Sequence, residues 1–265
     1  MDKFRYDFYV DYSRVDNLAR LSLDSIFQFT QIAVTEYFKS IGFDNRTMKI
    51  KYNSAWVFTK VKSIIKSIPS WDSKIYAKCY VTNIKPVKTN VEVVFFDSSD
   101  NILFAINDEM CVIDLESRKI KKLSDFGFDK ANTFDSIIDS PFMSIDESNL
   151  VKFDSLKVKY CDIDCTNHVN NVSYIRFIMN SLGVEFLDNY DITAMDFKYH
   201  KESRINEELE LYKKSYDNTL DILIKRNDDD IFSIKIKYKE GEYYVFIYKK
   251  GTVSWNWSNG YNTSC

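Results

Sequence analysis

Apolar residues recur at three- and four-residue steps in two stretches of the chain, which predicts two amphipathic helices. The first helix is expected over residues 21–42, with a buried face made of Leu23, Phe27, Thr30, Val34, Tyr37 and Ile41. The second is expected over residues 170–183, with an apolar face made of Val172, Ile175, Met179, Leu182 and Phe186. Ser22 or Asp24 is suited to cap the start of the first helix, and Gly42 its end.

Alternation of apolar and polar residues predicts strands around each helix. One strand precedes each helix, at residues 9–12 and 156–160, and polar turns at 97–101 and 227–230 join strands that follow. The alternation is clearest in the second half, at Leu220, Ile222, Ile224, Ile234, Ile236 and Tyr238. The order of strand, helix and several antiparallel strands occurs twice. This duplication indicates an α+β protein with one helix packed on each half-sheet.

The composition agrees with a globular protein that is rich in strands. Of the 265 residues, 45% are hydrophobic and 16% aromatic, while there are only 6 Gly and 3 Pro. The length is sufficient for two similar domains, each with its own core. The net charge of -3 mixes both signs along the chain and gives no basic stripe. We therefore expect no nucleic-acid partner.

The five cysteines are scattered and lack the density of a disulfide scaffold, which favours a reducing cytoplasm. Cys161 and Cys165 lack the second pair that a zinc site needs, so we expect free thiols, no metal and no other cofactor. The start of the chain has no apolar run typical of a signal peptide, and no run of about 18 apolar residues occurs. These features predict a cytoplasmic protein without a membrane contact.

One segment, residues 160–174, places a carboxylate, a hydroxyl and an imidazole just before the second predicted helix. Asp164, Thr166 and His168 are spaced by two, so in an extended segment their side chains face the same side. Such a group is a candidate reaction centre. A cysteine nucleophile at Cys165, with His168 as its base, is an alternative.

The helix start that follows this segment offers free backbone N–H groups, which stabilise negative charge. Backbone donors near Val169, Asn170 and Asn171 would therefore suit an oxyanion that develops on a carbonyl. On spacing alone a plainer interpretation is favoured. In that interpretation the two asparagines cap the helix, and His168 is an ordinary core or surface histidine.

The segment resembles the catalytic segment of acyl-ACP thioesterases, Asp-x-Asn-x-His-Val-Asn-Asn-x-x-Tyr, and follows it at Asp164, His168, Val169, Asn170, Asn171 and Tyr174. It departs at Thr166, where the family has Asn. Residues 56–60 and 69–72 look like the family's Trp-Val-x-Thr-Arg and Pro-x-Trp-Gly-Asp signatures. The resemblance covers nearly the whole chain to about Tyr248. It implies a tandem hotdog fold, in which an antiparallel sheet wraps a long helix in each half.

The duplication and the resemblance together predict four regions. Residues 1–125 form an N-terminal hotdog domain with the acyl-chain cavity, and residues 126–150 form a linker. Residues 151–250 form a C-terminal, catalytic hotdog domain. Residues 251–265 form a polar tail outside the resemblance.

A second polar cluster follows along a predicted strand that ends near residue 203. Glu202 matches the family's catalytic Glu in a Tyr-Arg-x-Glu-like segment, and Ser203 stands where plant members often carry Cys. Without the resemblance, Glu202 between Lys201 and Arg204 would be interpreted as a solvated salt-bridge residue of small energetic weight. Its assignment as a catalytic residue therefore depends on the resemblance.

The duplication also distinguishes the two halves chemically. Aligning residues 71–75 with residues 205–209 places Ile68 opposite Glu202, and the first half contains neither of the two histidines. One half thus carries polar chemistry at positions where the other half carries apolar side chains. We infer a single active site in the second domain, with the first domain supplying the acyl-chain cavity.

The resemblance implies hydrolysis of an acyl-ACP thioester to free fatty acid and ACP in fatty acid biosynthesis. Glu202 would act as general base on water, or alternatively as nucleophile, while Asp164 and His168 position the water or polarise the carbonyl. A carboxylate base works best when burial raises its pKa toward the working pH, and we expect an acyl-lined cavity to supply that burial. The hydroxyl of Thr166 cannot offer the two N–H groups of Asn, which predicts reduced activity or a water in the gap.

The partner implied is an acyl carrier protein with a phosphopantetheine-linked acyl chain. Basic residues suited to its acidic surface are Lys198, Lys201, Arg204, Lys213 and Lys214. Alternatives are an acyl-CoA thioesterase, a dehydratase of 3-hydroxyacyl thioesters, and a non-catalytic acyl-thioester binder or sensor, which the Thr166 departure motivates. The duplicated unit already supplies the pairing of two hotdogs, so either a monomer or a homodimer is expected.

Overall fold

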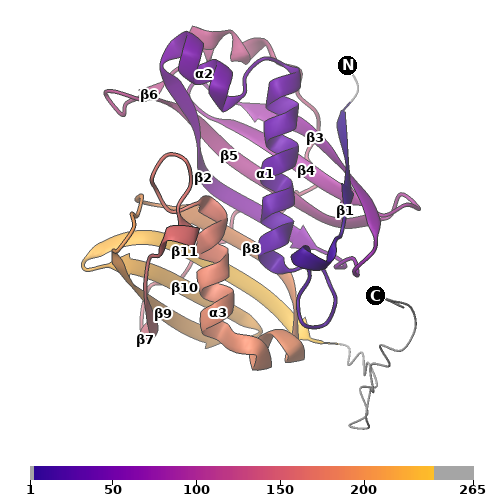
Figure 1. Ribbon diagram of the computed structural model, residues 1–265, viewed down its shortest axis with the longest axis vertical. Coiled ribbons are helices and arrows are strands. Elements are labelled where there is room, and N and C mark those ends of the chain that lie inside the picture. Colours follow the sequence, from indigo (N-terminus) through magenta and orange to yellow (C-terminus); the bar gives the residue numbers. More distant parts are fainter. Residues whose placement is uncertain (1–2, 242–265) are drawn as a thin grey trace, which may run out of the picture.

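The computed structural model describes residues 3–241 and contains one eleven-stranded sheet (Figure 1). The strands of the first half are β1 (Phe4–Tyr9), β2 (Ser54–Ile65), β3 (Lys74–Ile84), β4 (Thr89–Phe96), β5 (Ile102–Asp114) and β6 (Ile120–Lys121). Those of the second half are β7 (Val151–Lys157), β8 (Tyr190–Tyr199), β9 (Glu208–Tyr216), β10 (Thr219–Arg226) and β11 (Asp229–Glu240).

The strand order confirms the internal duplication. Along the sheet the strands run β1-β3-β4-β5-β2-β8-β11-β10-β9-β7, and β6 pairs with β5. Read outward from the centre, the first half is β2-β5-β4-β3-β1 and the second half is β8-β11-β10-β9-β7. Each half therefore uses the same antiparallel connectivity, with its first strand at the outer edge of the sheet.

One long helix crosses the sheet in each half (Figure 1). The predicted first helix is confirmed as α1 (Leu23–Ser40), and Ser22 caps it by accepting a hydrogen bond from the amide of Ser25 at 3.4 Å. The second, α3 (Asn171–Asn189), runs beyond its predicted end. Gly183 has a φ of 78° and leaves the helical conformation, but the chain resumes the helix after it.

Local capping by aspartates explains where the predicted elements are wrong. The strands expected at residues 9–12 and 156–160 end earlier, and the residues after them form the short helices η1 (Tyr12–Arg14) and η4 (Tyr160–Asp162). Asp11 accepts from the amide of Ser13, and Asp162 from the amide of Lys159, each at 2.8 Å. These carboxylates turn the backbone out of the sheet.

Sequence periodicity also missed the helix α2 (Asn45–Tyr52). Asp44 caps it by accepting from the amides of Arg46 and Thr47, at 3.0 and 3.1 Å. None of the helices in the described part of the chain has the length and apolarity needed to cross a membrane.

The two halves join at their central strands, β2 and β8. Lys60 pairs with Lys198, and Val61 with Phe197, so the sheet continues across the junction. Beside these pairs the hydroxyl of Ser63 donates to the carbonyl of Met195 at 2.8 Å. The junction thus combines backbone pairing with side-chain hydrogen bonds. The helices α1 and α3 also pack against each other.

We propose that residues 126–150 link a first domain, 1–125, to a second domain, 151–250. The short helices η2 (Leu123–Phe126) and η3 (Phe128–Lys130) precede or open this segment, and residues 131–150 contain neither helix nor strand. The end of the second domain and the predicted tail, 251–265, lie outside the described residues.

Three buried carboxylates hold this linker against the sheet. Glu92 accepts from the amide of Ile137 at 2.8 Å, Asp196 from Met143 at 2.8 Å, and Asp221 from Asp146 at 2.9 Å. Because each carboxylate lies on a different strand, the linker follows a fixed path across both halves.

Candidate active site

The loop between η4 and α3 is a tight turn rather than the extended segment we expected. The amide of Asp164 donates to the carbonyl of His168 at 2.9 Å, and that of Asn167, at a φ of 64°, donates to the carbonyl of Asp164 at 3.0 Å. The Asp164 carboxylate also accepts from the amide of Thr166 at 2.8 Å. An aspartate that bonds an amide two residues ahead favours a turn, and this turn still brings the three side chains together.

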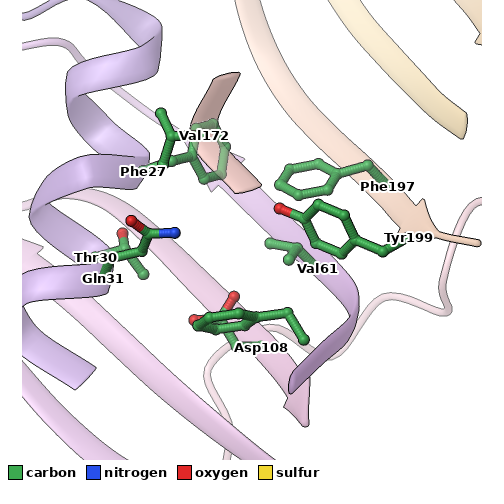
Figure 2. A pocket seen from close by; sticks show the side chains of 9 residues that line it. Phe27, Thr30, Gln31, Val61, Asp108, Val172, Phe197 and Tyr199 are labelled. Carbon is green, nitrogen blue, oxygen red and sulfur yellow. The ribbon is translucent and has the colours of Figure 1, made fainter. Parts of the chain in front are cut away.

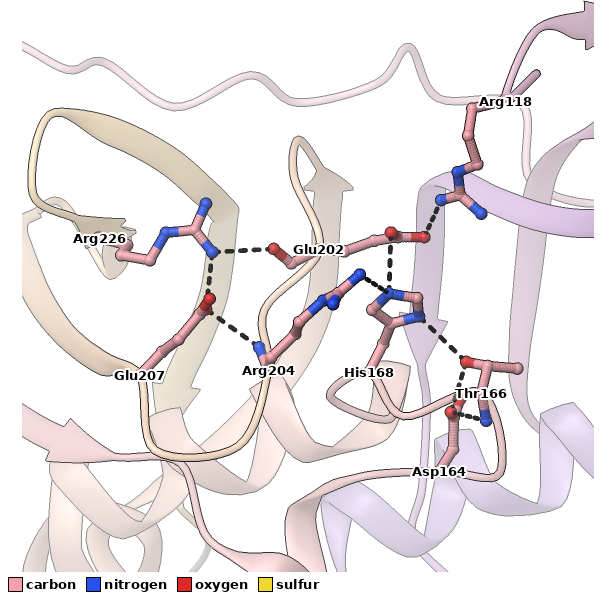
Figure 3. Close-up of polar contacts among 8 residues, drawn as sticks. All are labelled: Arg118, Asp164, Thr166, His168, Glu202, Arg204, Glu207 and Arg226. Atoms are coloured by element: carbon pink, nitrogen blue, oxygen red, sulfur yellow. Dashed lines mark hydrogen bonds and ion pairs between the residues drawn. The ribbon is translucent and has the colours of Figure 1, made fainter. Parts of the chain in front are cut away.

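A chain of polar contacts joins all four predicted catalytic residues (Figure 3). The hydroxyl of Thr166 lies 2.6 Å from the Asp164 carboxylate and 3.2 Å from Nδ1 of His168. Nε2 of His168 lies 3.2 Å from Oε2 of Glu202. The structure therefore brings together Asp164, Thr166, His168 and Glu202, although Glu202 comes from a loop after β8.

The number of hydrogens on these side chains limits which group donates and which accepts in each polar contact. The Thr166 hydroxyl has one hydrogen, and when Asp164 receives it the hydroxyl accepts from Nδ1–H of His168. Nε2 of a neutral ring is then an acceptor, which suits the guanidinium of Arg204 at 3.4 Å. A charged ring instead donates from Nε2 to Glu202. His168 thus has one partner suited to each protonation state.

Glu202 is more exposed than we expected. Its side chain is 45% exposed, against 18% for His168, so the prediction that an acyl cavity buries this carboxylate is wrong. Its second oxygen pairs with Arg118, which belongs to the turn between β5 and β6 in the first half (Figure 3). Glu202 therefore lies at the surface between the halves and bridges a residue from each.

The first half contributes Arg118 to the site, which the sequence did not indicate. Arg118 lies in a polar turn and adopts a φ of 58°, and 84 residues separate it from Glu202. A lone arginine in such a turn is usually solvated. Only the antiparallel arrangement of the two halves places it beside the carboxylate.

Further ion pairs fix the loop that carries Glu202. Arg226, on β10, donates to the Glu202 carbonyl at 3.1 Å and to the Glu207 carboxylate at 2.6 Å. Glu207 also accepts from the amide of Arg204 at 3.0 Å. The exposed ion pair considered from the sequence is found for Glu202 itself, with Arg118, and the neighbouring Lys201 pairs with Asp229.

The expected oxyanion donors at Val169 and Asn170 are already occupied, so this part of the prediction is wrong. The amide of Val169 donates to the carbonyl of Ser203, and that of Asn170 to the carbonyl of Asp162, both at 2.8 Å. These bonds attach the loop to neighbouring segments. The Asn170 side chain caps α3 by accepting from Val172 at 3.0 Å, as the plainer interpretation had it.

The amide of Asn171 is the donor that remains at this helix start. Within residues 3–241 it has no hydrogen-bond acceptor. A free N–H at the positive end of a helix is suited to an oxyanion. Asn171 therefore stays a candidate for this role.

The first half contains the same turn, but without the hydroxyl and the imidazole side chains. The amide of Asp16 donates to the carbonyl of Arg20 at 2.7 Å, and the Asp16 carboxylate accepts from the amide of Leu18 at 2.9 Å. These bonds correspond one by one to those of the turn that begins at Asp164. Leu18 thus replaces the hydroxyl residue and Arg20 the histidine.

The backbone also supports the alignment that places Ile68 opposite Glu202. Asp72 and Asn206, which this alignment equates, have left-handed φ values of 67° and 69°. Each is followed closely by the start of an equivalent strand, β3 or β9. The hydroxyl, imidazole and carboxylate therefore occur together in one half only, which supports a single site.

A small cavity lies between the halves, close to the start of α3 (Figure 2). Its volume is about 20 Å³, enough for one water molecule and too small for an acyl chain. Its walls are formed by Phe27, Thr30, Gln31, Phe58, Val61, Asp108, Val172, Phe197 and Tyr199. Both halves line it, and at this size it is not the acyl-chain cavity that we expect the first domain to contribute.

The remaining sequence candidates form no second site. Cys161 and Cys165 are exposed free thiols, as predicted, and within the described residues Cys165 forms no hydrogen bond with His168. Within the same part of the chain, no three His, Cys, Asp or Glu side chains are grouped to hold a metal ion.

Comparison with known proteins covers both halves. The model of the acyl-ACP thioesterase N-terminal domain matches residues 1–127, and that of the C-terminal domain matches residues 145–245. A palmitoyl-acyl carrier protein thioesterase of Gossypium hirsutum is 24% identical over 171 residues, which are 61% of this chain and 41% of the relative. An acyl-[acyl-carrier-protein] hydrolase of Cuphea viscosissima is 25% identical, over 74% of this chain and 50% of the relative. The chain thus spans about half the length of these curated relatives.

Solved structures share the fold. An acyl-ACP thioesterase from Bacteroides thetaiotaomicron superposes with a TM-score of 0.82 at 21% identity, covering 89% of this chain and 97% of that one. The 12:0-ACP thioesterase from Umbellularia californica gives 0.79 at 15% identity, covering 90% and 97%. The predicted α+β, tandem hotdog fold is confirmed. Because the two domain models together match most of the sequence, the chain belongs to the acyl-ACP thioesterase family.

Proposed function

We propose that this protein hydrolyses acyl-ACP thioesters to free fatty acid and ACP, with Glu202, His168, Thr166 and Asp164 as the reacting and positioning groups. The observation that carries the proposal is the unbroken chain of contacts among these four side chains, present in one half only. Family membership supplies the reaction class. The free amide of Asn171 supports the same assignment.

In this mechanism Glu202 takes a proton from a water molecule, whose oxygen attacks the thioester carbonyl carbon. The carbonyl electrons move to oxygen, and the oxyanion is stabilised by the Asn171 amide at the start of α3. When the intermediate collapses, the carbon–sulfur bond breaks and the protonated Glu202 returns its proton to the departing thiolate. The exposed position of Glu202 gives water direct access to it.

His168 and Thr166 position Glu202 through the series of polar contacts that links it to Asp164. The Thr166 hydroxyl lies between Asp164 and His168 and contacts both, at the position where the family pattern has Asn. A protonated His168 can donate to Glu202 and hold its carboxylate in place. We therefore propose that the Thr166 departure preserves catalysis, in preference to the non-catalytic sensor.

The proposed partner is an acyl carrier protein, and the structure refines the basic surface suggested for it. Lys201 pairs with Asp229, and Lys214 with Asp146 at 2.5 Å, so both are neutralised locally. The other three predicted residues, Lys198, Arg204 and Lys213, form no ion pair with an acidic side chain of residues 3–241. Among them Arg204 lies beside His168. Cytoplasmic location and oligomeric state stay predictions.

The test is thiol release from acyl-ACPs of graded chain length, with the matching acyl-CoAs in parallel. We expect release from acyl-ACP, with a lower kcat/KM for acyl-CoA, and an acyl product of unchanged structure. The panel includes a 3-hydroxyacyl-ACP, and a dehydrated acyl product from it would favour the dehydratase. Binding of acyl-ACP without any thiol release would overturn the proposal and favour the sensor.

Arg118→Ala is expected to lower thiol release about tenfold, because the carboxylate of Glu202 loses the partner that orients it. The free energy of unfolding should change by less than about 1 kcal/mol, since both side chains are nearly half exposed. Arg5→Ala, which removes an exposed arginine paired with Asp7, is the matched control. Equal rates for the two variants would show that Arg118 does not position the base.

A further inference from the structure

Asp108 is a buried carboxyl group that the fold leaves without a partner. It lies on β5 with 3% of its surface exposed, and its Oδ2 has no hydrogen-bond partner within the described residues. Burial of an unpaired polar group costs free energy. The buried carboxylates of Glu92, Asp196 and Asp221 accept hydrogen bonds from the linker. Asp108 differs from them because it holds no such segment in place.

The cavity between the halves gathers further polar groups around Asp108. Figure 2 shows the Gln31 amide and the Tyr199 hydroxyl directed toward the same space as the Asp108 carboxyl. The Gln31 amide makes no hydrogen bond with another residue of the part that the structure describes. The rings of Phe27 and Phe197 supply apolar wall. Three polar groups thus converge inside an apolar surround: an amide and a carboxyl, which can donate and accept, and the oxygen of Tyr199, which can accept.

This cavity adjoins the proposed reaction centre. Val172 forms part of its wall and directly follows Asn171, whose free amide is the proposed oxyanion donor. The Tyr199 hydroxyl donates to the carbonyl of the same Asn171 at 3.4 Å. A group held in the cavity therefore lies near the start of α3, as the thioester carbonyl would.

We propose that Asp108, Gln31 and Tyr199 bind a hydroxyl group carried on the acyl chain, a few carbons from the thioester. The inference rests on the proposed function and names its substrate class as hydroxylated acyl thioesters. A cavity of about 20 Å³ accommodates one oxygen atom of this kind. A hydroxyl both donates and accepts, so it can donate to the Tyr199 oxygen and accept from the Gln31 amide or the Asp108 carboxyl.

The preference for a hydroxylated over a saturated acyl chain depends on which polar groups of the cavity each substrate leaves without a hydrogen bond. A substrate hydroxyl replaces the hydrogen bonds of a water in the cavity, whereas a methylene displaces that water and replaces none. Sites built to bind a hydroxyl discriminate strongly against analogues that lack it. Burial raises the pKa of Asp108 to about 8, so at neutral pH its carboxyl carries a hydrogen that it can donate.

The experiment compares kcat/KM for saturated acyl-ACP with that for chain-matched acyl-ACPs hydroxylated at successive carbons from C3. We expect wild type to prefer at least one hydroxylated substrate about tenfold or more. Asp108→Leu should abolish this preference, while Asp108→Asn, which still donates and accepts, should keep most of it. Thr30→Val is the control, because the Thr30 hydroxyl in the cavity wall is already bonded to the Ile26 carbonyl at 2.9 Å.

Calorimetric binding of the free fatty acids separates this inference from the proposed function. Tighter binding of a hydroxylated acid by wild type, lost in Asp108→Leu, supports the site even if no thioester is hydrolysed. Equal treatment of saturated and hydroxylated ligands in both assays overturns the site, while release from saturated acyl-ACP leaves the hydrolase proposal standing. Asp108→Leu is expected to fold, since it removes an unpaired buried carboxyl, and circular dichroism checks this.

Discussion

Glu202→Gln and Asp164→Ala are each expected to lower the kcat for thiol release from acyl-ACP at least about a hundredfold. The glutamine keeps the shape of Glu202 but cannot take a proton from water. The alanine removes the acceptor that holds the amide and the hydroxyl of Thr166, so the contact with Nδ1 of His168 is no longer fixed. Steady-state rates at saturating acyl-ACP measure both losses.

Glu116→Gln provides the matched control, because Glu116 lies exposed in the same turn as Arg118 and takes no part in the polar chain. Its kcat should equal that of wild type. A Glu202→Gln variant that kept more than about a tenth of the wild-type rate would exclude general-base catalysis by this carboxylate.

The stability of the wild type should fall, relative to Asp108→Leu, as the pH rises from about 4 to about 8. Burial raises the pKa of Asp108 from 3.8 to about 8, so within this window the unfolded chain releases a proton that the folded chain keeps. Below the window the carboxyl is protonated in both states, so the stability of the wild type relative to Asp108→Leu is at its highest there. The difference grows by at most about 1.4 kcal/mol per pH unit and levels above the folded pKa.

Urea unfolding of both proteins at several pH values measures this difference, and titrations common to both cancel. The titratable groups coupled to Asp108 are Cys79 and Tyr199, whose pKa values burial raises well above 9.0 and 10.0, so both stay neutral throughout the window. A difference that does not vary with pH would show that Asp108 is ionised or solvated in the folded protein.

The fold was largely predictable because the duplication repeats its pattern. The helix periodicities and alternating strands each occur twice, and the structure confirms the equivalent order in the two halves. Element ends were less predictable, since single side chains such as Asp11 and Asp162 decide where a strand gives way to a turn.

The site was predictable where neighbours in sequence form it and where the family pattern names a residue. Asp164, Thr166 and His168 belong to one turn, and Glu202 entered through the resemblance. Arg118 and the occupied amide of Val169 depend on contacts between distant segments, which no local pattern contains. Asp108 left a weak signal, as part of a polar run inside an otherwise apolar strand, but burial alone distinguishes it.

The pairing of β2 with β8 also limits how such a protein can recombine. Separating the halves would expose backbone N–H and C=O groups of both central strands, and open edges of this kind promote aggregation. A foreign hotdog could replace one half only if its own central strand matched the register at Val61 and Phe197 and its linker met the three carboxylates. The two halves are therefore expected to be inherited as a matched pair rather than exchanged as independent modules.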